Sequence, residues 1–135
     1  VVIALENTVN SQNRAIIYAG AKNSLYYIDN QNTHEIQVIK GSRRAIGGYQ
    51  NESIEFINHH ITLSQGSLVY LCSDGYIDQN NPERKRLGNE RFIQLIKEVS
   101  PLSIEEQALA FKQALEDHMQ DSLQRDDILL LGVRV

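Results

Sequence analysis

The 135-residue sequence predicts an α+β fold built around a large antiparallel sheet system. Short apolar or alternating segments, separated by only a few polar residues, fill the first half of the chain. Links of that length suit hairpins, whereas parallel strands need long, usually helical, crossovers. Two segments with helical periodicity follow one another in the second half, so the helices should be grouped together. We expect residues 1–135 to form a single domain.

The expected strands are short runs of β-branched, aromatic and other apolar residues bounded by turn-forming residues. Those of the first half are 1–5, 14–21, 24–29, 34–39, 53–63 and 67–73. The first two should pair as a hairpin. The fourth alternates polar and apolar residues at Ile36 and Val38, and should therefore be half exposed. A final, buried strand is expected over 128–135.

The first predicted helix begins near Asn89, a potential cap, and ends before Pro101. Its buried stripe should consist of residues at helical spacing: Phe92, Leu95, Ile96 and Val99. The second helix should begin with a capping box, Ser103 with Glu106 three residues on, and run to about Gln120. The residues expected on its buried face are Ala108, Phe111, Leu115 and Met119.

The composition disfavours several functions. A net charge of −4 and a pI near 5.5 disfavour nucleic acid and anionic membranes as partners. No apolar run approaches the ~20 residues of a membrane span. The one cysteine, Cys72, excludes an internal disulfide and fits a reducing cytoplasm. Because it lies in an apolar run, we expect an inert core thiol.

Two acidic signals lie at the ends of predicted strands. Asp74 follows the buried run 68–72, and Gly75 after it can adopt backbone angles that other residues resist. Asp126 and Asp127 open the last strand. If the two strands are antiparallel neighbours, Asp74 and Asp126 converge, and paired carboxylates attract hard cations such as Mg²⁺ or Mn²⁺. The alternative is a common Asp-Gly turn and a solvated strand start.

The segment 41–50 has three glycines, two adjacent arginines and no periodicity. It should be an ordered loop whose backbone passes close to another group. Arg43 and Arg44 could bind a substrate phosphate; the alternative is a solvated pair of loop charges. The basic loop residues 84–86 border the predicted acidic site and could help to recruit a phosphoprotein.

Four segments resemble one known family. Residues 70–79, Tyr-Leu-Cys-Ser-Asp-Gly-Tyr-Ile-Asp-Gln, resemble the Ser-Asp-Gly motif of the metal-dependent protein serine/threonine phosphatases, the PPM family. Residues 125–135 resemble the closing motif of that family. Residues 18–28 and 45–49 resemble signatures of its bacterial, SpoIIE-like branch. The resemblance implies a PPM-type antiparallel β-sandwich flanked by helices, of which this chain is the later, N-terminally truncated part.

The resemblance also implies a chemistry. Asp74 and Asp126 would be ligands in a site for two Mn²⁺ or Mg²⁺ ions, while Asp127 occupies a position where the family varies. A metal-activated water would attack phosphoserine or phosphothreonine, so no protein side chain is expected to be the nucleophile. The family's earlier Asp-Gly ligand has no counterpart here. We therefore expect an incomplete metal site and a fragment that is inactive alone.

The family also suggests biological context. The substrate would be a phosphorylated regulatory protein of the anti-anti-sigma-factor type, in bacterial signal transduction. A sensor domain would precede this one in a cytoplasmic protein or in the cytoplasmic part of a membrane-anchored sensor. Missing helices would expose an apolar sheet face and favour homo-oligomers. The alternatives are a non-catalytic PPM-like protein-binding module and, more remotely, an unrelated metal-binding structural domain.

Overall fold

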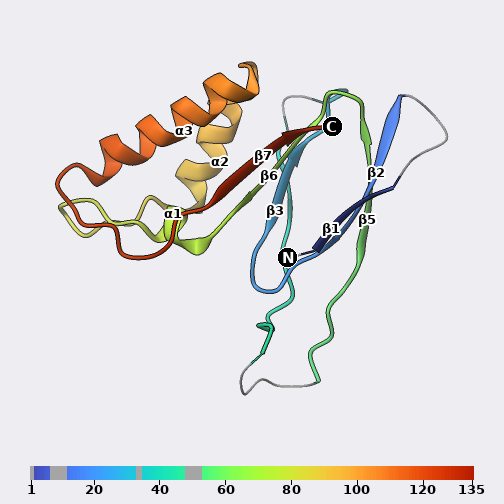
Figure 1. Ribbon diagram of the computed structural model, residues 1–135, viewed down its shortest axis with the longest axis horizontal. Helices are drawn as coiled ribbons and strands as arrows, with labels where there is room; N and C mark the ends of the chain where they lie inside the picture. The colour runs from blue at the N-terminus through green and yellow to red at the C-terminus, as the bar shows by residue number, and fades with distance from the viewer. Residues whose placement is uncertain (1, 7–11, 33–34, 48–52) are drawn as a thin grey trace. The chain divides into compact units, whose positions relative to one another are not determined.

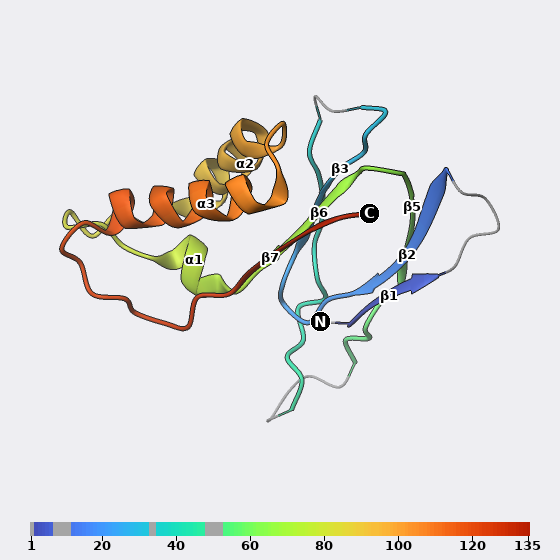
Figure 2. The same ribbon diagram turned by 45° about the horizontal axis from the view of Figure 1, so that its top comes forward.

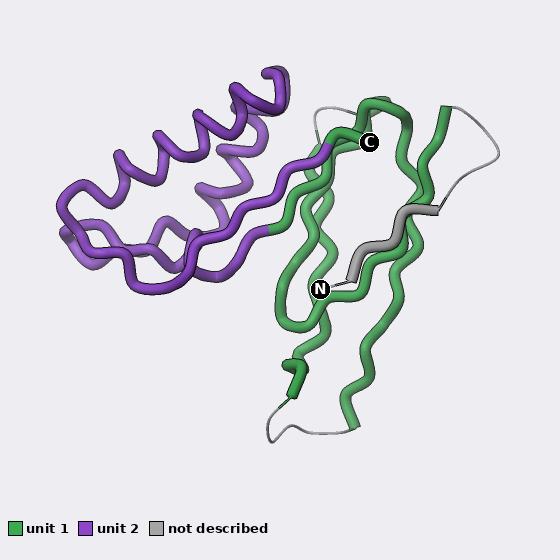
Figure 3. The backbone as a smooth tube through the Cα atoms, viewed as in Figure 1, with its two compact units in different colours: residues 1–71, 134–135 green, residues 72–133 purple. Residues whose placement is uncertain are grey.

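The computed structural model describes residues 2–6, 12–32, 35–47 and 53–135 (Figure 1). The chain divides into two compact units (Figure 3). Unit 1 comprises Val1–Leu71 with Arg134–Val135, and unit 2 comprises Cys72–Val133. The expectation of a single domain over 1–135 stays a prediction. None of the helices in the described part of the chain has the length and apolar character needed to cross a bilayer.

The strands form two sheets whose strand pairs of known register are all antiparallel. One sheet has the order β1-β2-β5 and the other the order β4-β3-β6-β7. The strand bounds are Val2–Glu6 (β1), Asn13–Ala19 (β2), Leu25–Ile28 (β3), Gln37–Ile39 (β4), His59–Ser64 (β5), Leu68–Cys72 (β6) and Leu130–Arg134 (β7). The predicted hairpin of the first two strands is confirmed, with Ala4 opposite Ile17.

A hydrophobic core within unit 1 joins the two sheets. Strand β2 buries alternate residues, Ile16 and Tyr18, because successive side chains of a strand point to opposite faces. The core cluster contains residues of both sheets: Ile16, Tyr18, Ile61 and Leu63 from one, Leu25 and Val69 from the other. The predicted antiparallel β-sandwich is therefore present, and Figure 2 shows its two sheets from a second angle.

Unit 2 contains the helices α1 (Asp74–Asp78), α2 (Gly88–Val99) and α3 (Ile104–Met119). One buried aromatic side chain from each helix meets at its centre. The Tyr76 ring centroid lies 5.4 Å from that of Phe92 and 6.2 Å from that of Phe111. The Tyr76 hydroxyl donates to the Phe111 carbonyl at 2.8 Å. This cluster anchors the short helix α1, which has too few residues to be stable alone.

The helix predictions are largely confirmed. The predicted stripe of α2 is buried in full. Ser103 and Glu106 form both hydrogen bonds of the capping box, and the bond from the Ser103 amide lowers the pKa of the Glu106 carboxyl. Two details were wrong. Asn89 lies inside α2 and does not cap it, and Ala108 is exposed, because Gln107 takes the buried position beside Phe111.

Two strand predictions need correction. Residues 53–58 are not a strand; the alternating pattern there leaves Phe56 and Ile57 exposed, and β5 begins at His59. The last strand, β7, is half exposed rather than buried, with Leu131 on its open face. In both places the apolar residues suggested burial, but packing did not cover them.

The glycine-rich loop passes close to another segment, as predicted, at Gly41. A Cβ added at Gly41 would lie 2.2 Å from the Asn23 carbonyl oxygen. The Ser42 amide donates to the Gly20 carbonyl at 2.8 Å, and the Lys22 amide donates to the Ser42 carbonyl at 2.8 Å. The contact is with the turn after β2, and residues 48–50 of the predicted loop lie outside the described residues.

We predict that Phe92→Ala destabilises unit 2 by about 3–5 kcal/mol, because it empties the centre of the aromatic cluster. The control is Leu109→Ala on α3, whose side chain is 68% exposed. This control should change the free energy of unfolding by no more than about 0.5 kcal/mol. Urea unfolding of both variants measures the difference, and similar losses for the two would contradict the packing described.

Candidate metal and phosphate site

Strand β6 leads directly into a helix rather than into a turn. Ser73 is extended (φ −69°, ψ 161°), and α1 begins at Asp74. The alternative of a simple Asp-Gly turn after the strand is therefore wrong. The Ser73 hydroxyl makes no capping bond to α1, because it is used elsewhere.

Ser73 instead joins the end of β6 to the segment before β7. Its amide donates to the Leu129 carbonyl at 2.9 Å. Its hydroxyl donates to the Asp127 carbonyl at 2.8 Å and accepts from the Leu129 amide at 2.9 Å. One residue thus makes three hydrogen bonds across 54–56 positions of sequence. These bonds fix the two acidic segments against each other.

Gly75 lets the two backbones approach. A Cβ at this position would lie 2.4 Å from the Asp127 carbonyl oxygen and 3.4 Å from the Asp126 carbonyl carbon. No side chain fits at that distance, so the glycine is required by space. We had expected unusual backbone angles, but Gly75 is not among the residues with positive φ.

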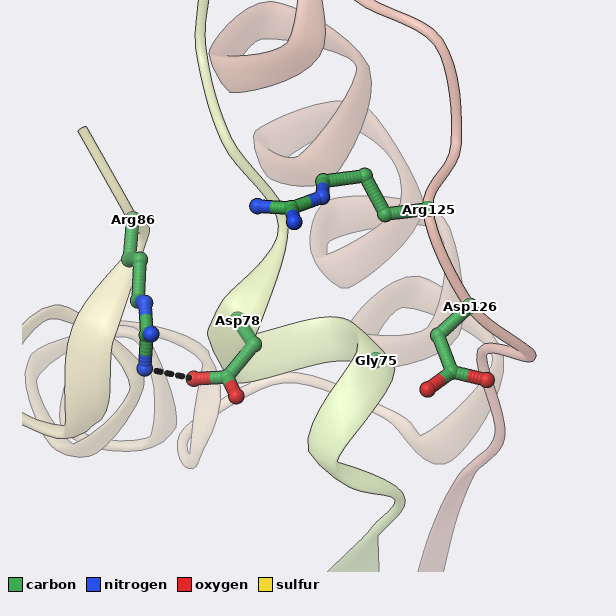
Figure 4. Close-up of a pocket in the computed structure, with 5 residues that line it drawn as sticks. All are labelled: Gly75, Asp78, Arg86, Arg125 and Asp126. Atoms are coloured by element: carbon green, nitrogen blue, oxygen red, sulfur yellow. Dashed lines mark hydrogen bonds and ion pairs between the residues drawn. The ribbon is translucent and has the colours of Figure 1, made fainter. Parts of the chain in front are cut away.

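The backbone segments that contain Asp74 and Asp126 therefore meet, at Gly75 and residues 126–127. Asp126 lines a pocket of about 170 Å³ together with Gly75, the neighbour of Asp74 (Figure 4). One oxygen of Asp126, Oδ1, accepts from the Asp127 amide at 2.7 Å. Asp74, Asp126 and Asp127 are all exposed. The assignment of Asp74 and Asp126 as metal ligands stays a prediction.

The donor set suits a hard cation in part. Exposed carboxylates at the meeting point offer only oxygen, the ligand that Mg²⁺ and Mn²⁺ prefer. Within the described residues, however, no group of three or more histidine, cysteine, aspartate or glutamate side chains could hold a metal ion. The chain thus supplies some of the ligands that such a site needs.

Three charged residues other than the predicted metal ligands also line this pocket. They are Asp78, Arg86 and Arg125. Arg86 donates to the Asp78 carboxylate at 3.0 Å (Figure 4). Arg86 belongs to the basic loop that we expected to border the site. Asp78 lies four residues after Asp74, and this spacing would have placed both on one face had α1 been predicted.

Gln79 organises the segment that precedes Asp126. Its side chain is 1% exposed. The amide nitrogen Nε2 donates to the carbonyls of Leu123 at 3.0 Å and Asn80 at 3.1 Å, while Oε1 accepts from the Arg125 amide at 3.3 Å. A buried amide with partners on both of its atoms holds neighbouring backbone firmly. No sequence pattern indicates this role.

Arg43 and Arg44 belong to unit 1, whereas Asp74 and Asp126 belong to unit 2. Arg44 donates to the Ile54 carbonyl at 3.2 Å, and its guanidinium carbon lies 5.6 Å from the centre of the Phe56 ring. These contacts hold Arg44 within its own loop region. A phosphate-binding role for the two arginines stays a prediction.

Cys72, the residue before Ser73, is buried and unpaired. Burial, and secondarily the Asp74 charge, raise the pKa of its thiol to about 12. The thiol is therefore protonated near neutral pH and is a poor nucleophile. The pKa is consistent with the expected inert core thiol.

A family model and a solved structure both place this chain in one family. The family model described as "Stage II sporulation protein E (SpoIIE)" matches residues 2–135. A search of curated proteins gave no match. Among solved structures, the SiaA-PP2C domain of Pseudomonas aeruginosa is 34% identical, with a TM-score of 0.78 over 92% of this chain and 47% of that one.

The SpoIIE phosphatase domain of Bacillus subtilis, in a form presoaked with Mn, is also similar in fold. It is 12% identical, with a TM-score of 0.56 over 99% of this chain and 56% of that one. The present chain thus spans about half the length of each of these two solved chains. Both comparisons match the predicted PP2C-type, or PPM-type, fold.

We predict that Ser73→Ala loosens the contact between the two acidic segments. The lost hydroxyl should cost about 1–3 kcal/mol of unfolding free energy, since both of its hydrogen bonds disappear. Hydrogen exchange at the Leu129 amide should accelerate, because that amide donates to the Ser73 hydroxyl. The matched control is Ser100→Ala, whose exposed hydroxyl bonds only locally, to the Lys97 carbonyl. Unchanged exchange at Leu129 in Ser73→Ala would disprove the linking role of Ser73.

Proposed function

The chain belongs to the SpoIIE family of PP2C-like phosphatase domains, and on that basis we propose that it serves in the hydrolysis of phosphoserine or phosphothreonine on a protein. The reaction would depend on divalent metal ions. The observation that carries this proposal is the junction at Ser73 and Gly75, which joins the segment of Asp74 to that of Asp126.

In this proposal Asp74 and Asp126 bind the metal through carboxylate oxygens. Asp126 Oδ1 is oriented by the Asp127 amide, which leaves Oδ2 available for a cation. Asp127 contributes its backbone: the amide orients Asp126, and the carbonyl accepts from Ser73. We therefore assign Asp127 a supporting role rather than that of a primary ligand.

Mn²⁺ or Mg²⁺ bound there would act as a Lewis acid. It would also lower the pKa of a water molecule and so make that water a better nucleophile toward a phosphate ester. The Mn-presoaked state of the Bacillus subtilis domain supports Mn²⁺ as the first ion to test. The chain's own contribution is to hold two carboxylates on a rigid junction, which keeps the ligands in place without reorganisation. No side-chain nucleophile is required, in agreement with the high pKa of Cys72.

We further propose that the 135-residue chain binds metal weakly and is inactive or nearly inactive alone. A two-metal site needs more carboxylates than Asp74 and Asp126 provide, and no group of three candidate ligands occurs in the described segments. This same observation favours the second candidate function, a non-catalytic protein-binding module of the same fold. Metal binding at Asp74 and Asp126 distinguishes the two.

The biological setting is also proposed from the family. The substrate would be a phosphorylated regulator of the anti-anti-sigma-factor type, in bacterial signal transduction in the cytoplasm. A sensor domain upstream would regulate the phosphatase. Self-association through exposed apolar residues such as Leu129 and Leu131 is a further proposal, supported by their open position on and beside β7.

We predict that Asp74→Asn and Asp126→Asn each weaken Mn²⁺ binding by about tenfold or more, because each removes one charged oxygen ligand. Titration calorimetry on the 135-residue chain measures the affinity. The matched control is Asp121→Asn, an exposed aspartate that does not line the pocket described above, which should bind Mn²⁺ as the unmodified chain does.

Equal Mn²⁺ affinity in all three variants would reject the metal site and favour the protein-binding module. The same samples with p-nitrophenyl phosphate test the second part of the proposal. We expect little or no turnover; rapid turnover that requires Asp74 would show that the chain's site is complete.

A further inference from the structure

One charged side chain at the pocket beside Asp126, that of Arg125, has no charged or hydrogen-bonding partner among the described residues. Four charged side chains line it: Asp78, Arg86, Arg125 and Asp126. Arg86 and Asp78 form an ion pair at 3.0 Å, so their charges cancel. The charge of Asp126 is compensated if it binds a cation, as proposed above. Arg125 then remains, and its guanidinium makes no hydrogen bond or ion pair with the described residues.

The backbone that carries Arg125 is held on both sides. Its amide donates to the buried Oε1 of Gln79 at 3.3 Å, and Gln79 Nε2 holds the Leu123 carbonyl. On the other side, Gln124 Nε2 donates to the Asp126 carbonyl at 2.7 Å. The arginine therefore extends from an ordered segment rather than from a free loop. In Figure 4 its side chain extends from the backbone of residue 125 in the direction of Arg86.

The pocket has the size and polarity for a small oxyanion. Its volume of about 170 Å³ is far more than a single water molecule needs. Arginine presents a planar fork of donors that matches two phosphate oxygens at once, whereas lysine presents a point charge. A phosphate monoester that enters here would meet Arg125 on one side and the proposed metal ligand Asp126 on another.

We propose that Arg125 binds the phosphoryl oxygens of the substrate, with Gln79 as the residue that positions its backbone. This inference rests on the proposed phosphatase function. A cation at Asp126 would offset the negative charge of that carboxylate and so allow a negatively charged phosphate to bind beside it. Arg125 would thus determine specificity for a phosphate ester over a neutral group. Its substitution should leave the metal site itself intact.

The test titrates inorganic phosphate into the ¹⁵N-labelled 135-residue chain, first without divalent metal and then with Mg²⁺, and follows amide shifts by NMR. Shifts should concentrate at Gly75, Asp78 and Arg125. Arg125→Gln should weaken phosphate binding by about tenfold or more. Arg125→Lys should retain part of the affinity. Lys97→Gln, which removes one exposed positive charge from α2, should bind phosphate as the unmodified chain does.

The results separate this inference from the proposed function. If Mg²⁺ binds but Arg125→Gln binds phosphate normally, or the shifts lie elsewhere, the role of Arg125 is overturned while the metal site stands. If Mg²⁺ does not bind but phosphate binding still requires Arg125, the anion site stands and the proposed metal chemistry fails. Absence of phosphate binding under both conditions also overturns the inference.

Discussion

The three hydrogen bonds of Ser73, together with the close approach at Gly75, are the constraint on which the site depends. They join the end of β6 to residues 127–129 without any long side chain in between. Because the serine hydroxyl lies close to its own backbone, hydrogen bonds to it allow the two segments little freedom to move apart. Replacement of either residue therefore alters the relative placement of Asp74 and Asp126, even though neither residue carries charge.

A second set of polar contacts stabilises the segments next to this junction. Gln79 lies at the end of α1 and holds Leu123 and the Arg125 amide. Because its side chain is buried, each unsatisfied atom would cost about 1–3 kcal/mol, which favours one arrangement of the segment. Tyr76 fixes α1 from its other side by its bond to the Phe111 carbonyl. The acidic and basic side chains at the pocket are thus exposed to solvent, whereas the backbone to which they are attached is held in place by hydrogen bonds.

The sequence predicted the fold correctly where a local sequence pattern agreed with the tertiary packing. The capping box at Ser103, the apolar stripe of α2 and the alternation in β2 all match packing seen in the structure. Prediction failed where the sequence pattern did not match the burial seen in the structure, or where an element was too short to have a pattern. Residues 53–58 alternate like a strand but remain outside the sheets, and α1 is too short to show periodicity. The convergence of the two acidic segments could be inferred from strand ends, but Gln79 and Arg125 could not, because their roles depend on contacts across more than forty residues.

We propose that Asp74 and Asp126 bind a divalent ion together. Paramagnetic broadening tests it directly: Mn²⁺ is added in substoichiometric amounts to the ¹⁵N-labelled chain, and loss of amide signal is mapped along the sequence. Since both segments lie at one junction, the signals of 74–79 and 125–129 should broaden together and before all others. Broadening of only one of these segments, or of a region elsewhere in the chain, would contradict the proposal.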